Sequence, residues 1–145
     1  MELHYTEGTT ADIKHLLALG ILAYGQFQQI LTEENWNTMY TNVSSEKTYT
    51  DLIEKSRCFV CMANNEIVGM AYLMPSGNPT KIFQADWSYI RMVGVNPRFE
   101  GRGIAKKLTQ LCIECAIEKK EKNIVRRTSP ELVFFQFQAI SVYLS

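Results

Sequence analysis

Apolar and polar positions in the first 55 residues follow helical spacing after a short alternating start. The alternation over Leu3–Thr6 predicts a first strand. Apolar residues then recur every three or four positions up to about residue 25, where two nearby glycines weaken the helical pattern. A second helix is predicted to begin after Thr32, a suitable N-cap followed by two glutamates that favour the positive end of a helix. A third helix is predicted over Thr48–Glu54.

The middle of the chain has the pattern of three strands. Two apolar runs, Cys58–Ala63 and Ile67–Met74, are separated by Asn-Asn-Glu, which is typical of a β-hairpin. A loop rich in turn-forming residues follows over Pro75–Thr80. Trp87–Val95 is the third long strand, and an Asn-Pro pair ends it because proline has no N–H to donate to a sheet ladder.

The last third of the chain predicts one helix, one strand and an ambiguous segment. Helical spacing runs from Gly103 to about Lys119, and Ile124–Thr128 has the composition of a strand. The stretch FFQFQAISVYLS fits a helix and a strand equally well. Since there is no internal repeat and no linker, the pattern predicts one α+β domain over residues 1–145.

The composition is that of an ordinary globular domain, with 46% hydrophobic and 21% charged residues. Fifteen basic and fifteen acidic side chains cancel, which gives no electrostatic reason to expect nucleic acid or a membrane surface as the main partner. The start lacks the basic segment and apolar stretch of a signal peptide, and no apolar run is long enough to span a membrane. We therefore expect a cytoplasmic protein.

Four cysteines form two C-x-x-C pairs, a spacing that zinc sites also use. Cys58 and Cys61 lie in a strand pattern, where an offset of three places side chains on opposite faces. Cys112 and Cys115 lie one helical turn apart among apolar residues. Free cysteine behaves as a small buried hydrophobe, and a reducing compartment disfavours disulfides. We interpret all four as packing residues and expect no metal site.

Two glycines spaced G-x-G connect the third long strand to the C-terminal helix. Arg102 lies between Gly101 and Gly103, and Lys106 and Lys107 follow in the first helical turn. Basic residues at the positive end of a helix suit a bound anion, and glycines let a phosphate approach the unpaired first-turn amides. The turn therefore indicates either a phosphate site or a simple connection with solvated basic residues. The spacing of a P-loop does not occur here. The dinucleotide fingerprint G-x-G-x-x-G begins at Gly101 but has Lys106 in place of its third glycine.

The segment MVGVNPRFEGRGIAKKL resembles the most diagnostic motif of the GNAT superfamily of N-acetyltransferases. That family has a strand, a proline-containing break and [RQ]-x-x-G-x-[GA] at the start of its main helix, and the corresponding stretch here is EGRGIA at residues 100–105. The resemblance also covers the order of predicted elements over nearly the whole chain, and EIVGMAYL is similar to the family's third strand. It implies a three-layer α/β/α fold with a mixed, mostly antiparallel sheet.

Two features depart from the family pattern. In the preferred alignment, Glu100 occupies the first motif position, where the family has Arg or Gln. An alignment that starts at Arg98 satisfies the motif literally, but it puts the start of the helix in the wrong place. Glu100 puts a carboxylate close to the implied pyrophosphate site, so we expect its side chain to point away. The family also continues past its last helix with one or two strands, which we expect to be missing here. Truncation, an altered reading frame or completion by a partner chain, as in a homodimer, would account for this.

The resemblance implies acetyl-CoA as the donor and a primary amine of a small molecule or protein as the acceptor. Free backbone groups at Val93, Gly94 and Val95 would pair with the pantetheine arm, and an N–H near Val93 would stabilise the oxyanion. Gly94 would permit close approach. The pyrophosphate would lie on the turn and the first helical residues, namely Gly101, Arg102, Gly103, Ile104, Ala105 and Lys106.

The same resemblance implies catalytic groups. Asp86, at the start of the long strand, is the candidate base for the acceptor ammonium, whose pKa is about 10.4 for a lysine-type amine. Tyr143, in a pattern similar to A-x-x-x-Y of the family's last helix, is the candidate acid for the departing thiolate. Asp86 can also be a simple turn residue, and Tyr143 can pack in an interface. Residues Tyr24–Trp36 would line the acceptor side.

Two other functions are compatible with the sequence. One is a non-catalytic, regulatory module that binds acyl-CoA, which the short C-terminus favours. The other is a protein whose basic turn binds a different phosphate ligand, such as ATP.

Overall fold

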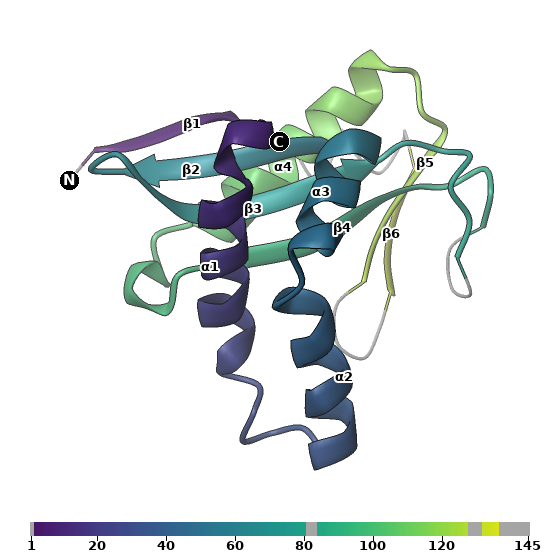
Figure 1. Cartoon of the computed structure of the whole chain (residues 1–145). Helices are drawn as coiled ribbons and strands as arrows, with labels where there is room; N and C mark the ends of the chain where they lie inside the picture. The colour runs from purple at the N-terminus through teal and green to yellow at the C-terminus, as the bar shows by residue number, and fades with distance from the viewer. Residues whose placement is uncertain (1, 81–83, 128–131, 137–145) are drawn as a thin grey trace.

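A computed structural model describes residues 2–80, 84–127 and 132–136, whose strands form one mixed sheet between helical layers (Figure 1). In chain order the elements are β1 (Leu3–Glu7), α1 (Ile13–Gly25), α2 (Glu33–Val43), α3 (Glu46–Lys55), β2 (Arg57–Ala63), β3 (Glu66–Met74), β4 (Ser88–Val95), α4 (Ile104–Glu118), β5 (Asn123–Arg127) and β6 (Leu132–Gln136). Short 3₁₀ turns precede α1 and α4, over Thr10–Asp12 and Pro97–Phe99 respectively.

The sheet has the spatial order β1-β2-β3-β4-β5-β6. Neighbouring strands are antiparallel except β4 and β5, which are parallel. Parallel neighbours need a crossover connection, and α4 supplies it. The predicted mixed, mostly antiparallel sheet is confirmed. The first three residues of the segment that fitted a helix and a strand equally well, residues 134–136, belong to β6, which is antiparallel to β5.

A two-asparagine turn joins β2 to β3. Asn64 and Asn65 have φ values of 53° and 62°, and Ala63 pairs with Glu66 across the turn. Positive φ at both loop positions is the type I′ turn, whose twist matches that of the strands, and asparagine tolerates this conformation better than most residues. The predicted hairpin is confirmed.

The N-terminal helices lie where the hydrophobic pattern predicts them. α1 ends at Gly25, and the Asn35 amide donates a hydrogen bond of 3.2 Å to Oγ1 of Thr32, the N-cap of α2. α3 begins at Glu46, two residues before the predicted start, because Ser45 is the extended residue that precedes it. Such differences are usual at helix ends.

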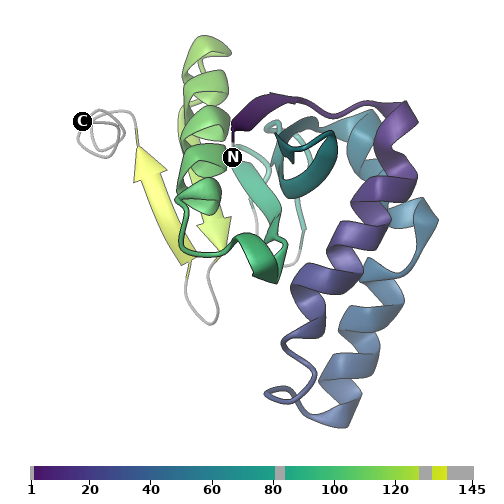
Figure 2. The ribbon, with the colours of Figure 1, turned by 90° about the vertical axis from the view of Figure 1, so that its left-hand side faces the viewer.

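Helices cover both faces of the sheet, as Figure 2 shows. α4 packs on one face, whereas α1 and α3 pack on the other and α2 lies against α1. Each face has its own buried core: Leu108 and Ile113 belong to the α4 core, and Leu16 and Leu52 belong to the α1–α3 core. The predicted three-layer architecture is therefore confirmed.

Tyr49 fixes the contact between α1 and α3. Its side chain is fully buried, and its hydroxyl donates a hydrogen bond of 2.7 Å to the carbonyl oxygen of Val43. A Cβ atom added at Gly20 of α1 would lie only 1.9 Å from the Tyr49 hydroxyl oxygen. The absence of a side chain at Gly20 is thus what allows the two helices to approach.

The four cysteines are buried free thiols. Cys58 lies in the α1–α3 core and Cys61 in the α4 core, so the strand spacing places them on opposite faces as predicted. Burial raises the pKa of the Cys58 thiol to about 12 and also raises the pKa of Cys61 and of Cys115. These thiols stay protonated at neutral pH. No group of three or more His, Cys, Asp or Glu in the described ranges could hold a metal ion.

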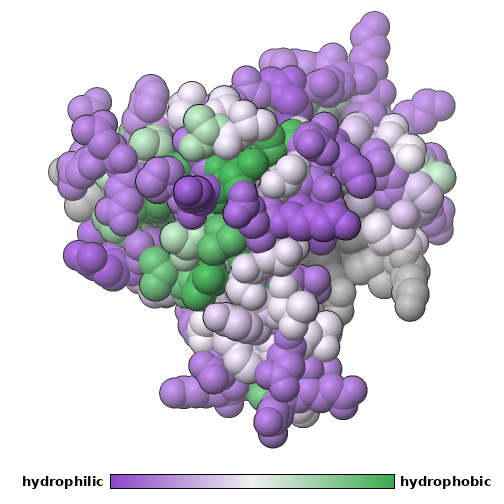
Figure 3. All heavy atoms as spheres, in the orientation of Figure 1, coloured by the Kyte–Doolittle hydropathy of each residue, from purple (hydrophilic) through white to green (hydrophobic). Residues whose placement is uncertain are grey.

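The surface is mostly polar, but apolar side chains gather over α1 on the face seen in Figure 3. Leu22 of α1, for example, is 54% exposed. No helix among the described residues is long and apolar enough to cross a membrane.

Candidate active site

The second half of β4 carries a bulge. Arg91 pairs with Tyr72 of β3 and Gly94 pairs with Met70, so β4 has one more residue than β3 between these two pairs. Met92, within the bulge, has a φ of 51°, which is unusual for a residue with a long side chain. A bulge interrupts the ladder locally and changes the direction of neighbouring side chains.

β4 also separates from β5 at this place. The parallel pairing covers Ser88, Tyr89 and Ile90, which lie opposite residues 124–126 of β5. Beyond Ile90, no described residue of β5 pairs with β4. The β5 edge of residues 91–95 is therefore open, and an extended ligand can form strand-like hydrogen bonds with an edge of this kind.

The turn between β4 and α4 contains two glycines in the left-handed region. Gly101 has a φ of 78° and Gly103 a φ of 75°, a conformation that strongly favours glycine. A Cβ atom at either position would meet no atom within 4 Å. The backbone conformation thus requires the glycines, and the space in front of them is open, as a ligand cradle needs.

The start of α4 presents amides without protein partners. The first helical hydrogen bond runs from the Lys107 amide to the Gly103 carbonyl oxygen at 3.0 Å, and no side chain caps the helix. Among the residues that the structure describes, the amides of Gly103, Ile104, Ala105 and Lys106 donate to no protein group. Such amides, together with the helix dipole, attract anions.

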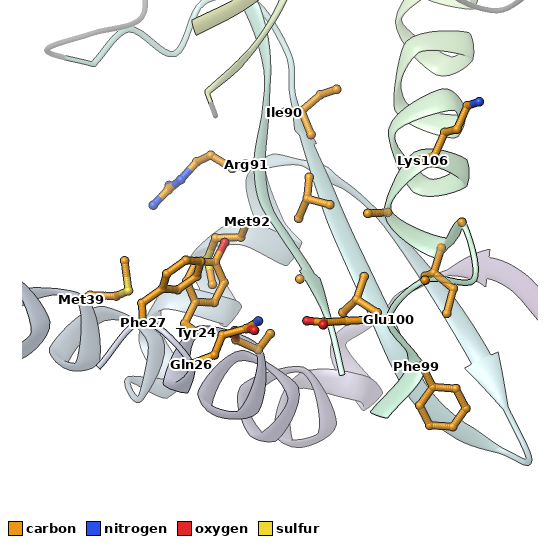
Figure 4. Close-up of a pocket in the computed structure, with 18 of the residues that line it drawn as sticks. Tyr24, Gln26, Phe27, Met39, Ile90, Arg91, Met92, Phe99, Glu100 and Lys106 are labelled. Atoms are coloured by element: carbon orange, nitrogen blue, oxygen red, sulfur yellow. The ribbon is translucent and has the colours of Figure 1, made fainter. Parts of the chain in front are cut away.

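The open edge of β4 and the start of α4 meet in one cavity of about 1120 Å³ (Figure 4). The opposite wall comes from the C-terminal end of α1, the loop that follows it and α2. Tyr24, Phe27 and Met39 give this wall an aromatic and apolar character. The structure therefore joins a polar main-chain half of the cavity to an apolar half on α1 and α2.

Most of the predicted cofactor residues lie together in this cavity. Those that line it are Val93, Gly94, Val95, Gly101, Gly103, Ile104, Ala105 and Lys106. Arg102 is not a lining residue, and its guanidinium carbon lies 5.2 Å from the centre of the Phe99 ring. The Arg102 side chain thus forms a cation–π contact within the turn.

Gly94 has a packing role, and its predicted role toward a cofactor stays a prediction. A Cβ atom there would lie 3.1 Å from Cε of Met70 and 3.2 Å from Cβ of Ala23. Protein atoms fill the space on the Cβ side of Gly94. The glycine lets α1 lie close against β4 and so brings the end of α1 to the cavity.

The two predicted catalytic residues are not part of the described cavity wall. Asp86 is exposed in the turn before β4 and does not line the cavity. Tyr143 lies outside the described residues. Their roles as base and acid stay predictions.

Two charged residues line the cavity although the sequence analysis gave neither a role in binding or catalysis. The carboxylate of Glu100 points toward Gln26 at the end of α1, away from the first turn of α4 (Figure 4), in line with the expected orientation. Arg91 of β4 lies on the same side as Phe27 and Met39. Strand alternation alone could have predicted the face of the sheet on which Arg91 lies. The bulge that follows Arg91 has no signal in the sequence.

Comparison with known proteins begins with sequence. A profile of the Acetyltransferase (GNAT) family matches residues 27–143, which is most of the chain. No curated protein matches the sequence.

Solved structures of acetyltransferases have a similar fold. The PaiA N-acetyltransferase from Thermoplasma acidophilum, in complex with coenzyme A, has a TM-score of 0.72 at 12% identity, covering 99% of this chain and 87% of that one. A GNAT family acetyltransferase from Brucella melitensis, in complex with acetyl-CoA, has a TM-score of 0.69 at 14% identity, with coverage of 94% and 88%. The ribosomal-protein-S18-alanine N-acetyltransferase from Escherichia coli has a TM-score of 0.63 at 15% identity, with coverage of 99% and 75%.

At these identities the structural likeness concerns the fold alone. The chain belongs to the acetyltransferase (GNAT) family.

Proposed function

We propose that the protein is an N-acetyltransferase that transfers the acetyl group of acetyl-CoA to a primary amine of a small molecule or protein. The observation that carries this proposal is the meeting, in one cavity, of unpartnered α4 amides with the open edge of β4. The amides of residues 103–106 would hold the pyrophosphate, and the open edge would pair with the pantetheine arm. The two donor sets match a ligand that is anionic at one end and extended at the other.

The reaction needs two proton transfers. The acceptor amine loses a proton and its nitrogen forms a bond with the thioester carbonyl carbon; the carbon–sulfur bond then breaks, and the thiolate takes up a proton. An amide of the bulge near Val93 would stabilise the oxyanion formed in between. Tyr143 is our proposed proton donor for the thiolate.

Two carboxylates compete for the role of base. Asp86 is the candidate from the sequence, but it is exposed and outside the cavity wall. Glu100 is the only carboxylate among the described residues that line the cavity. Since a general base must reach its proton directly or through one water, position favours Glu100.

We expect Glu100→Gln to lower kcat about 100-fold at neutral pH, and Asp86→Asn to lower it much less. Steady-state rates of both variants and the wild type, measured at one neutral pH with saturating acetyl-CoA, check this. A larger loss for Asp86→Asn would assign the role to Asp86.

The function itself is tested in two steps. Calorimetric titration with acetyl-CoA measures binding, and thiol release across a panel of amines and peptides measures transfer. We expect binding and acceptor-dependent release. Tight binding without release for any acceptor would favour the non-catalytic acyl-CoA-binding module, and a preference for ATP over coenzyme A would contradict the proposed cosubstrate.

A further inference from the structure

Strand alternation from Tyr89 places Arg91 on the face of the sheet opposite α4, and the bulge that follows it adds Met92 to the same side. Ile90 and Val93 pack with the α4 core, whereas Tyr89 and Met92 pack with the α1–α3 core. Arg91 also lines a second, smaller cavity of about 420 Å³ beside Asp51 and other residues of α3. The bulge therefore puts two consecutive side chains, those of Arg91 and Met92, on the α1–α3 side.

The start of α4, our proposed diphosphate site, lies on the other face of the sheet. The unpartnered amides belong to the first turn of α4, which packs on the other face of the sheet. Figure 4 shows the Arg91 side chain directed toward α2, on the side of Phe27 and Met39, while Lys106 points away from them. An anion held by Arg91 is thus separate from a diphosphate held by α4.

The Arg91 guanidinium is exposed to the cavity and has no ionic partner among the described residues. The one salt bridge in that part of the chain joins Arg57 to Glu7, and no carboxylate oxygen there lies within 4.0 Å of Arg91. The aromatic and apolar wall from α1 and α2 supplies no acidic group either. A guanidinium offers a planar fork of donors that matches a carboxylate in two parallel hydrogen bonds.

We propose that Arg91 binds a carboxylate of the acceptor, so that the substrate is an amine that also carries a carboxylate, as in an amino acid. This inference rests on the proposed transferase function and names its substrate class. The apolar wall lowers the local dielectric and strengthens the ion pair, while the same positive charge repels acceptors with several amines. Arg91 is a specificity residue, and the transfer itself uses other groups.

The test compares matched acceptors. Free amino acids, their C-terminal amides and a polyamine are offered to the wild-type protein and to Arg91→Gln, and kcat/KM is measured for each. We expect the wild type to favour the amino acid over its amide by about 10- to 100-fold. This preference opposes intrinsic reactivity, because the amine of an amide loses its proton more easily.

Arg91→Gln should remove the preference while its affinity for coenzyme A stays within about twofold. Arg57→Gln is the matched control, since Arg57 is another exposed strand arginine that lines neither cavity, and its ion pair with Glu7 contributes little. It should keep the wild-type ratio. Because the readout is a ratio of two acceptors, partial loss of folded protein does not affect it.

An unchanged ratio in Arg91→Gln, or a wild-type preference for amides or the polyamine, would overturn the inference while leaving the transferase function intact. If no acceptor is acetylated, calorimetry with amino acids on the coenzyme A complex separates the two proposals. Binding that depends on Arg91 would support the inference although the transferase proposal fails. Absence of such binding would overturn the inference.

Discussion

The substitution Gly103→Glu is expected to reduce affinity for acetyl-CoA by at least about 100-fold, or ~2.7 kcal/mol. Gly103 has a φ of 75°, so any side chain there costs about 1–2 kcal/mol in backbone strain. The larger effect is electrostatic, because the new carboxylate would lie close to the unpartnered amides at the start of α4 and would repel a diphosphate. Calorimetric titration measures the affinity, and far-UV circular dichroism checks that helix content is kept.

Gly77→Glu is the matched control. Gly77 has a φ of 96° in the loop between β3 and β4, and a Cβ atom there would also meet nothing within 4 Å. This variant therefore carries a similar backbone strain and the same new charge, but outside the cavity wall that the first turn of α4 belongs to. We expect its affinity for acetyl-CoA to stay close to that of the wild type. Unchanged affinity in Gly103→Glu would mean that the turn is only a structural connection.

The largest expected loss of stability follows from Gly20→Ala. The new methyl carbon would lie 1.9 Å from the Tyr49 hydroxyl oxygen, so the buried ring must move and its hydrogen bond to Val43 must lengthen or break. Overpacking costs about 1–3 kcal/mol and a lost buried hydrogen bond a similar amount. The better helix propensity of alanine returns only about 1 kcal/mol. We expect a net loss of about 3 kcal/mol in the free energy of unfolding, measured by urea titration.

Two further variants make this prediction specific. Gly25→Ala, at the end of the same helix, has nothing within 4 Å of the new methyl group and should be neutral or stabilising. In the double variant Gly20→Ala, Tyr49→Phe, the two losses should be less than additive, because the methyl group and the hydroxyl compete for one space. Full additivity would show that the steric contact is not the cause.

Local signals were sufficient to predict most of the helices and strands, whereas their arrangement in three layers was implied by the family resemblance. The hairpin needed only two asparagines between apolar runs, and the N-cap at Thr32 needed only a hydroxyl before two glutamates. The stretch FFQFQAISVYLS stayed ambiguous because its apolar residues fit both periods, and pairing with β5 decides in favour of a strand for its first residues, 134–136. Tertiary pairing has no local signature.

The candidate site was likewise predictable from the sequence only in part. The glycine turn was visible because Gly101 and Gly103 provide a conformation that other residues avoid. The cavity position of Arg91 was not visible, because strand alternation predicts only its face of the sheet and not which helices surround it. The contact of Gly94 with α1 likewise requires knowledge of which helix crosses the strand.

The cradle at the start of α4 and the open edge of β4 are built from main-chain groups, which every residue type provides. Substitutions can therefore accumulate around them without removing a donor, provided that the backbone keeps its two left-handed glycines and its bulge. This gives a physical reason why lineages can drift far apart in sequence and still retain one backbone. Evolutionary change in what such a domain modifies would then fall on side chains such as Arg91, which the backbone positions but does not dictate.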